Sequence, residues 1–240
     1  MNCPYCGSTE IRKNGWRRGK QNHICTNCDR QFIDVYSPPK GYSDEKKIEC
    51  LKAYVNGAGF RAIERQTGVQ TLADSLTLRY HTTIINWVKQ IGEKLPEAPL
   101  TDKTPSVGEL DELETFVPVK KNKIWIWTAL DHFNRGILAW VVGDHSAETF
   151  KPLWNIVSFW GCYFYVTDGW RVYASFINPG DHIISKTYMT RVEGENTRLR
   201  HYLARLHRKT LCYSKSVDML KLSIKLLLHY LKYGQIPVFS

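Results

Sequence analysis

The sequence predicts an α/β domain with a mixed sheet, preceded by a small cysteine-rich module and a helical module. Three observations support this order: two C-x2-C pairs near the N-terminus, a helical hydrophobic period after them, and β-branched and aromatic strand patterns from Val107 onward. Proline-containing segments at 37–41 and 96–106 separate the parts. We therefore expect modules at residues 1–36, 42–93 and 106–240.

The charge of the chain indicates the kind of partner. It has 33 lysine and arginine residues against 23 aspartate and glutamate residues, a net charge of +10. Nucleic acid is the commonest partner of such a basic chain, and a merely basic soluble protein is the alternative. No run of about 18 apolar residues occurs, and the first residues lack a signal-peptide pattern. We expect no membrane partner and a cytoplasmic location.

The cysteine-rich module has the spacing of a metal site. Cys3 and Cys6 form one pair, Cys25 and Cys28 form the second, and 18 residues lie between the pairs. Four thiolates at this spacing can surround Zn²⁺ as a tetrahedron, which leaves no position for a catalytic water. A redox role is the alternative, but two paired motifs without a thioredoxin-like context argue against it. We expect a structural zinc ribbon.

Basic side chains lie between the two cysteine pairs. Such a ribbon is better suited to gripping phosphates than to reading base edges, and a solvated basic face is the alternative. The candidate DNA contacts here are Arg12, Lys13, Arg17, Arg18 and Lys20.

The helical module is predicted to be a helix-turn-helix. Ser43 is a plausible cap of the first helix, Phe60–Thr67 would be the supporting helix, and residues 80–91 would be the recognition helix. Residues 69–79 make a longer separation than the usual tight turn, so a helical spacer or dimerising bundle is the alternative. The candidate DNA contacts are His81, Thr82, Thr83, Asn86 and Lys89.

The third module alternates between strands and helices. An acid-bearing strand, an aromatic strand and its hairpin partner come first, then a helix capped by Ser146, two shorter strands and two final helices. This order fits a mixed sheet. We expect strands at 109–119, 124–130, 136–143, 163–166 and 183–184, and helices at 146–160, 191–206 and 217–233.

The strand at 163–166 runs directly into Thr167 and Asp168. In open α/β sheets ligands bind at this carboxyl edge, and a divalent cation is the usual compensation for an unpaired carboxylate there. Asp111 lies in a strand that should neighbour this one, and Glu193 opens a later helix, so three acids could hold two Mg²⁺ or Mn²⁺ ions. By spacing alone, other acids compete with Asp111 and Glu193: Glu109, Glu112, Glu114, Asp131 and Glu195.

The later helix also presents groups suited to phosphate. Glu193, Asn196 and Arg200 share one face at helical spacing. A solvated helix with ordinary ion pairs is the alternative, but acids are missing from the basic stretch at 198–209. Trp170 suits either base stacking or the core. The candidate phosphate contacts are Lys186, Asn196, Arg198, Arg200, Arg205, Arg208 and Lys209.

These motifs resemble those of a known family. The run TDGW…Y, then ISK-x-Y-x-T-x-x-E-x-x-N-x-x-L-R-x-x-LARL-x-RK-x-L and YSKS, resembles the catalytic domain of the insertion-sequence-one transposases, which are of the DDE type. ELDE, CPYC, CTNC and NGAGFRAIERQTGV resemble that family's first acidic motif and its zinc-binding and helix-turn-helix region. The resemblance implies a ribonuclease H-like fold with Asp111, Asp168 and Glu193 as the catalytic acids, the last two separated by 24 residues.

The resemblance also implies a function. We expect a transposase with structural Zn²⁺ and two catalytic Mg²⁺ or Mn²⁺ ions, which acts at the nucleoid. It would bind terminal inverted repeats in double-stranded DNA, cleave the transposon ends and join the 3′-OH ends to target DNA as a homodimer or larger assembly. The alternatives are a zinc-ribbon and helix-turn-helix regulator with an inactive catalytic domain, and a nuclease that cuts without joining.

Overall fold

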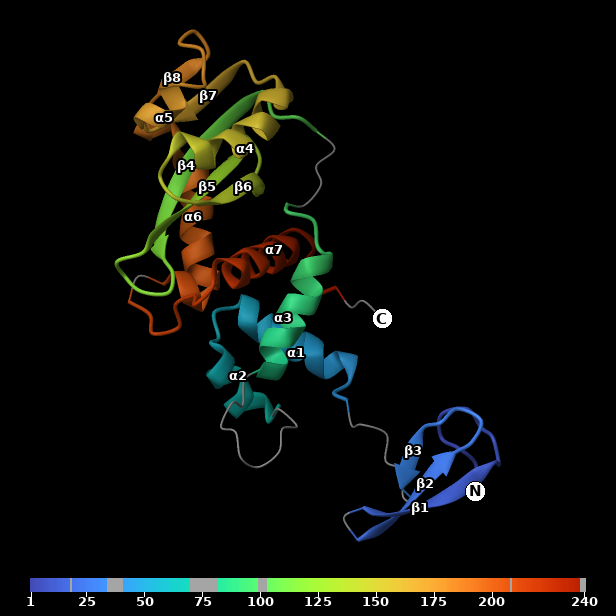
Figure 1. Ribbon diagram of the computed structural model, residues 1–240. Coiled ribbons are helices and arrows are strands. Elements are labelled where there is room, and N and C mark those ends of the chain that lie inside the picture. Colours follow the sequence, from blue (N-terminus) through green and yellow to red (C-terminus); the bar gives the residue numbers. More distant parts are fainter. Residues whose placement is uncertain (18, 34–40, 70–81, 99–102, 208, 238–240) are drawn as a thin grey trace. The chain divides into compact units, whose positions relative to one another are not determined.

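The computed structural model describes the whole chain except residues 18, 34–40, 70–81, 99–102, 208 and 238–240 (Figure 1). The chain divides into two compact units, Met1–Tyr42 and Ser43–Ser240. The helical module and the sheet domain thus belong to the same unit. None of the described helices is long and apolar enough to cross a membrane.

The first unit is a three-stranded antiparallel sheet. It consists of β1 (Ile11–Arg17), β2 (Lys20–Cys25) and β3 (Gln31–Ile33) in that order. Among the described residues of this unit, the buried apolar cluster consists of Cys3, Cys25 and Phe32, with Ile11 and Cys28 packed against them. A core this small seldom holds a domain together unaided, so a cross-link at the cysteines would supply much of its stability.

The helical module contains three described helices, whose ends follow local capping rules. Ser43 Oγ accepts a hydrogen bond from the Lys46 N–H (3.3 Å), and Gly68 ends the second helix in a left-handed conformation. The predicted turn and His81 lie outside the described residues, so the helix-turn-helix stays a prediction. The helices are α1 (Asp44–Val55), α2 (Phe60–Thr67) and α3 (Thr82–Lys94).

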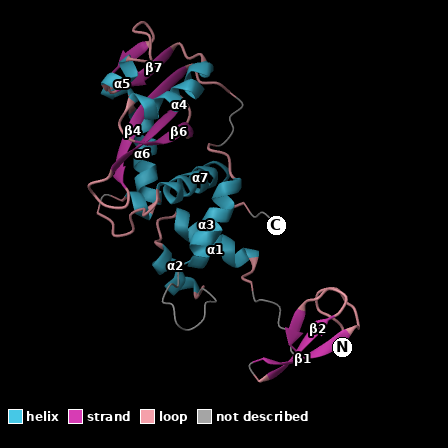
Figure 2. Cartoon of the chain, viewed as in Figure 1, coloured by secondary structure: helices cyan, strands magenta, loops and turns pink. Residues whose placement is uncertain are grey.

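The second unit also contains a mixed five-stranded sheet with the order β6-β5-β4-β7-β8. Figure 2 distinguishes its strands (magenta) from the helices (cyan). The first three strands form antiparallel pairs, β7 runs parallel to β4, and β8 runs parallel to β7. The predicted adjacency of the first and fourth strands of this sheet is confirmed, and the sheet is compatible with a ribonuclease H-like fold. The strands are β4 (Val107–Phe116), β5 (Lys123–Asp131), β6 (Ile137–Gly143), β7 (Phe164–Thr167) and β8 (His182–Ile184).

Helices cover both faces of this sheet. One face packs Leu110 and Trp127 against Phe150 of α4, while the other places Leu130 against Val192 of α6. Because side chains alternate along a strand, Glu109 and Asp111 of β4 face α6. The helices are α4 (Ala147–Val157), α5 (Arg171–Ala174), α6 (Thr190–Tyr202) and α7 (Val217–Tyr233), with short 3₁₀ turns η1 (Ser158–Trp160), η2 (Lys186–Tyr188) and η3 (Ala204–Leu206).

Two helix boundaries differ from the sequence expectation. α6 ends at Tyr202 rather than near residue 206, because Leu203 adopts an extended conformation (φ −104°, ψ 109°) before η3 begins. Likewise α4 ends at Val157, and the rest of the predicted helix forms η1. The apolar period continues through these breaks, so periodicity alone does not reveal them.

Candidate active site and cysteine centre

Asp111 lies in β4, and Asp168 directly follows the end of the neighbouring strand β7. The parallel register pairs Glu109 of β4 with Val166 of β7. Asp111 and Asp168 each follow two residues later, so both reach the same level of the sheet. Consistent with this proximity, the charge of Asp168 contributes to raising the pKa of Asp111.

Asp111 is a carboxyl group whose charge lacks compensation. Burial, then the neighbouring charge of Glu112, raises the pKa of Asp111 to about 7. Asn196 opposes this rise, because its Nδ2 donates to Asp111 Oδ2 at 2.8 Å. The Oδ1 of Asn196 in turn accepts a bond from Thr128 Oγ1 (3.2 Å), which orients the amide. This geometry fits a group that a cation would stabilise in its charged form.

Asp168 is held by the turn that follows β7. Its Oδ1 accepts a hydrogen bond from the Trp170 N–H (2.9 Å), and Gly169 between them has a φ of +86°. The Trp170 ring stacks on His145 at 4.3 Å with an interplanar angle of 3°. His145 stacks on Trp125 at 4.7 Å with an angle of 1°. The imidazole is therefore sandwiched between two indoles, and one of them belongs to the turn that orients Asp168.

Glu193 occupies the first turn of α6, three residues before Asn196 on the helix. Its side chain is exposed. Among the described residues, the cysteine group is the only set of three or more potential metal ligands whose atoms all lie within 4.8 Å of one another. The structure thus brings Asp111 and Asp168 together without closing the three acids into one tight group.

The competing acids have other partners. Glu109 is fully buried, and its Oε1 lies 2.5 Å from His132 Nδ1. Glu112 faces the opposite side of β4, where it contacts His145 Nε2 (2.9 Å) and accepts a bond from the Tyr173 hydroxyl (2.5 Å). The remaining three pair locally: Glu114 with Lys123, Asp131 with the Phe133 N–H and Asn134, and Glu195 with Arg198.

Glu109 has a further role that the sequence did not reveal. Its Oε2 accepts a hydrogen bond from the Val192 N–H (2.8 Å), in the first turn of α6. This N–H is one of the helix-end donors that need an outside acceptor. A strand carboxylate therefore caps the helix that carries Glu193.

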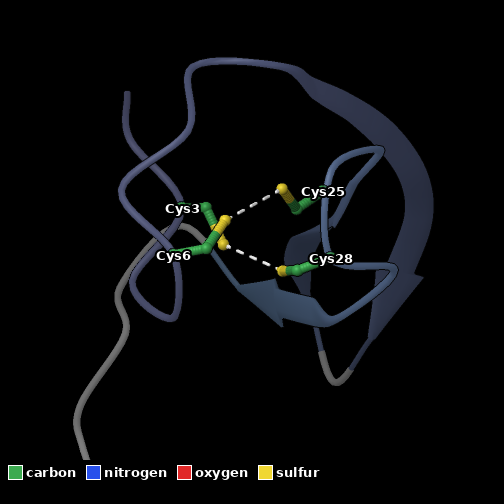
Figure 3. Close-up of side chains that lie close together, drawn as sticks. All are labelled: Cys3, Cys6, Cys25 and Cys28. Carbon is green, nitrogen blue, oxygen red and sulfur yellow. Dashed lines mark hydrogen bonds between the residues drawn. The ribbon is translucent and has the colours of Figure 1, made fainter.

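The four cysteines of the first unit converge on one point (Figure 3). The Sγ atoms of Cys3 and Cys28 lie 3.6 Å apart, as do those of Cys6 and Cys25. Sulfurs about 2.3 Å from a tetrahedral zinc ion would be about 3.8 Å apart, so the group fits Zn²⁺. A backbone hydrogen bond at Ser8 lowers the pKa of the Cys6 thiol to about 6, whereas burial and the neighbouring cysteines raise the pKa of the Cys28 thiol to about 12, so the thiolate forms first at Cys6.

Both cysteine pairs sit in the same kind of turn. The Gly7 N–H donates to the Cys3 carbonyl (2.9 Å), and the Asp29 N–H donates to the Cys25 carbonyl (2.8 Å). The two donor residues follow the second cysteine of each pair and have φ values of 75° and 55°. This repeated geometry aims both sulfurs of each pair toward the common point.

The predicted DNA contacts occupy varied environments. In the ribbon and α3, most are exposed, whereas Thr82 and Thr83 are half-buried. In the α6 region, Asn196 and Arg205 are buried, Arg198 pairs with Glu195, and Arg200 Nη2 donates to the Glu114 carbonyl (3.2 Å). Arg18, His81 and Arg208 lie outside the described residues. The exposed ones are Arg12, Lys13, Arg17, Lys20, Asn86, Lys89, Lys186 and Lys209.

The sheet domain is similar to known proteins. Residues 106–234 match a family model described as IS1 transposase. Insertion element IS1 protein InsB from Shigella flexneri is 38% identical over 124 residues, which are 52% of this chain and 92% of that protein. The Shigella sonnei protein of the same name is 37% identical with the same coverage, and insertion element IS1 9 protein InsB from Escherichia coli K12 is 37% identical over 72% of its length. The family model does not extend to residues 1–105.

Proposed function

Since this chain belongs to the IS1 transposase family, we propose that it binds the terminal inverted repeats of an insertion element, cuts the DNA at each end and joins the 3′-OH ends to target DNA. The observation that carries the proposal is the pairing of β4 with β7, which sets Asp111 beside Asp168. Phosphoryl transfer of this kind depends mainly on positioning and on charge stabilisation.

We assign Asp111, Asp168 and Glu193 as the acids that would hold Mg²⁺ or Mn²⁺. Carboxylate oxygens are the ligands such cations prefer, and the raised pKa of Asp111 identifies a carboxylate that gains from a nearby positive charge. Two bound ions would activate the attacking oxygen and stabilise the leaving oxygen. Asn196 and the Trp170 backbone orient the two aspartates for this role.

The four cysteines would hold a structural zinc ion. All four ligand positions would be filled by sulfur, so the ion would stabilise the ribbon without taking part in the reaction. The ribbon's exposed cations then remain available for DNA.

The ribbon and the helical module are proposed to bind the transposon ends. α3 would be the recognition helix, and its exposed Asn86 and Lys89 would face the DNA. Lys186, Arg198, Arg200, Arg205 and Lys209 would contact phosphates around the cleavage site. Pairing of two ends in one reaction implies at least a homodimer.

A strand-cleavage and strand-transfer assay tests the proposal. Purified protein and Mn²⁺ are mixed with labelled duplexes taken from the DNA that flanks its gene. Asp168→Asn is compared with Glu148→Gln, a control at an exposed position in the first turn of α4, on the face of the sheet opposite α6. We expect metal-dependent nicking and joining in the intact protein and the control, and a loss of at least about a hundredfold in Asp168→Asn.

Each other result has a definite meaning. Binding of the ends without cleavage by the intact protein would favour the regulator with an inactive domain. Released ends without joined products would favour the simple nuclease. Cleavage that persists in Asp168→Asn would place the active site elsewhere.

A further inference from the structure

A basic cavity lies at the C-terminal end of α6, away from the acids. Its volume is about 430 Å³, within the range of about 300–1000 Å³ typical of ligand sites. Four of its lining residues are cationic or can become so: Lys120, Arg200, Arg205 and His207. Glu114 is the one acid in its lining, and Lys123 pairs with that carboxylate at 3.1 Å.

Arg205 is the unusual member of this lining. It is only 8% exposed, yet within the described part of the chain no carboxylate pairs with it. Of its five N–H donors, Nη1 donates to Ser214 Oγ (2.9 Å), and the buried Nε has no acceptor among the described residues. A buried guanidinium without a carboxylate partner is costly, because Ser214, the Tyr54 hydroxyl and the two neighbouring rings replace only part of the hydration that burial removes.

Aromatic rings hold the guanidinium in place from the helical module. Arg205 Cζ lies 5.4 Å from the ring centroid of Tyr54 on α1 and 5.2 Å from that of Phe60 on α2. The two rings stack on each other at 4.7 Å. Burial raises the pKa of the Tyr54 hydroxyl, and the positive charge of Arg205 opposes that rise. These contacts fix the position of the charge without neutralising it.

We propose that this cavity binds a phosphate of the DNA backbone. A phosphate would supply the negative charge that Arg205 lacks, and it matches the planar fork of arginine donors. Lys120 and Arg200 would complete the positive lining. The site is distinct from the acids: Arg200 comes seven residues after Glu193 on the same helix, about 10 Å along its axis.

The position of the cavity favours a DNA backbone as the source of the phosphate. A separation of about 10 Å corresponds to about three nucleotides of a DNA strand, so one strand could reach both sites. The same arginine contacts Tyr54 of α1, the helix that packs against the proposed recognition helix α3. The identity of the anion rests on the proposed function, whereas the existence of an anion site rests on the cavity alone.

The salt dependence of DNA binding tests the proposal in the full chain. Dissociation constants for a mixed-sequence 40-base-pair duplex are measured at several NaCl concentrations for the intact protein, Arg205→Met and Lys120→Gln. Each lost phosphate contact should reduce the slope of log K against log salt by about one. Lys151→Gln is the control, because Lys151 lies exposed on α4 at the opposite face of the sheet and lines no part of the cavity. We expect both cavity variants to lose about one from the slope and the control to keep it.

Thermal unfolding separates a binding role of Arg205 from a purely structural one. Methionine can pack between Tyr54 and Phe60 without charge, so Arg205→Met should fold with an unchanged or raised Tm. Inorganic phosphate at matched ionic strength should raise the Tm of the intact protein and raise that of Lys120→Gln less. Because Lys120 lies in an exposed loop, this second variant keeps the test valid if Arg205→Met does not fold.

The outcomes distinguish the proposals. Unchanged slopes in folded cavity variants would overturn the DNA assignment, and stabilisation by phosphate in that case would show that the cavity takes a free anion. Reduced slopes in a protein that never cleaves DNA would uphold the cavity and count against the proposed transposase activity. Unchanged slopes in a protein that cleaves and joins DNA would overturn the cavity assignment and uphold the proposed transposase activity.

Discussion

Glu109 and Val192 are joined by a hydrogen bond of 2.8 Å between Oε2 of the strand residue and the N–H of the helix residue. The bond fixes the first turn of α6 against β4, one residue before Glu193. Asn196 makes a second bond to the same strand at Asp111. Two points of attachment therefore set both the position and the rotation of the helix that carries the third acid.

Glu109→Ala should weaken this attachment. It leaves the buried Val192 N–H without an acceptor, which typically costs about 1–3 kcal/mol. Urea unfolding measures the loss, and Glu109→Gln should lose less because its amide oxygen can still accept. An alanine variant as stable as the intact protein would contradict this account of the α6 cap.

The pH dependence of stability should reveal Asp111. Its pKa in the folded chain is raised to about 7, above the ordinary value of 3.8, so the folded state holds the proton more tightly than the unfolded state. Without added divalent cations, this group makes the protein less stable as pH rises from about 4 to about 7. Thermal unfolding of Asp111→Asn should show a gain over the intact protein at pH 8 that disappears at pH 4. Added Mg²⁺ should stabilise the intact protein, and not the variant, at pH 8.

His145 should act through Trp170 on the second aspartate. His145→Ala removes the ring between two indoles, which loosens the turn that orients Asp168. We expect the Mn²⁺ concentration for half-maximal cleavage to rise several-fold with a smaller change in the maximal rate. His145→Phe keeps the stack and loses only the contact to Glu112, so it should recover most of the metal affinity. Equal defects in both variants would mean that the stack has no positioning role.

Removal of zinc should unfold the ribbon selectively. The apolar cluster of the first unit is small, whereas the second unit has its own extensive core. Cys28→Ser, or a chelator, should make residues 1–42 sensitive to protease while the main thermal transition stays in place. A shift of that main transition by several degrees would show that the two units depend on each other.

Local chemistry made much of the fold predictable. The caps at Ser43 and Ser146 depend on neighbouring residues, and both were confirmed. The alternation of strands and helices also predicted that the strand of Asp111 neighbours the strand that ends just before Asp168. The four cysteines converge as their spacing predicted.

Contacts between distant residues could not be predicted in this way. The choice between Asp111 and Glu112 depends on which face of β4 meets α6, and the strand pattern does not specify that partner. Glu109 shares the face of Asp111, and only its contacts with His132 and Val192 set it apart. The sandwich around His145 joins side chains from three separate segments, and no spacing in the sequence signals it. Arg205 was expected to face phosphate from an exposed helix, but it lies buried beyond the end of α6.

The contacts of Arg205 with Tyr54 and Phe60 also constrain which related insertion elements can exchange the coding sequence of the helical module by recombination. Tyr54 is tied a second time to the sheet domain, since its hydroxyl lies 2.7 Å from Ser223 Oγ on α7. In a hybrid protein that receives its helical module from a relative, this module would pack correctly against Arg205 only if the donor has aromatic residues at these two positions. Lineages that recombine at residues 96–106 should therefore retain the two rings and the arginine as a co-inherited set.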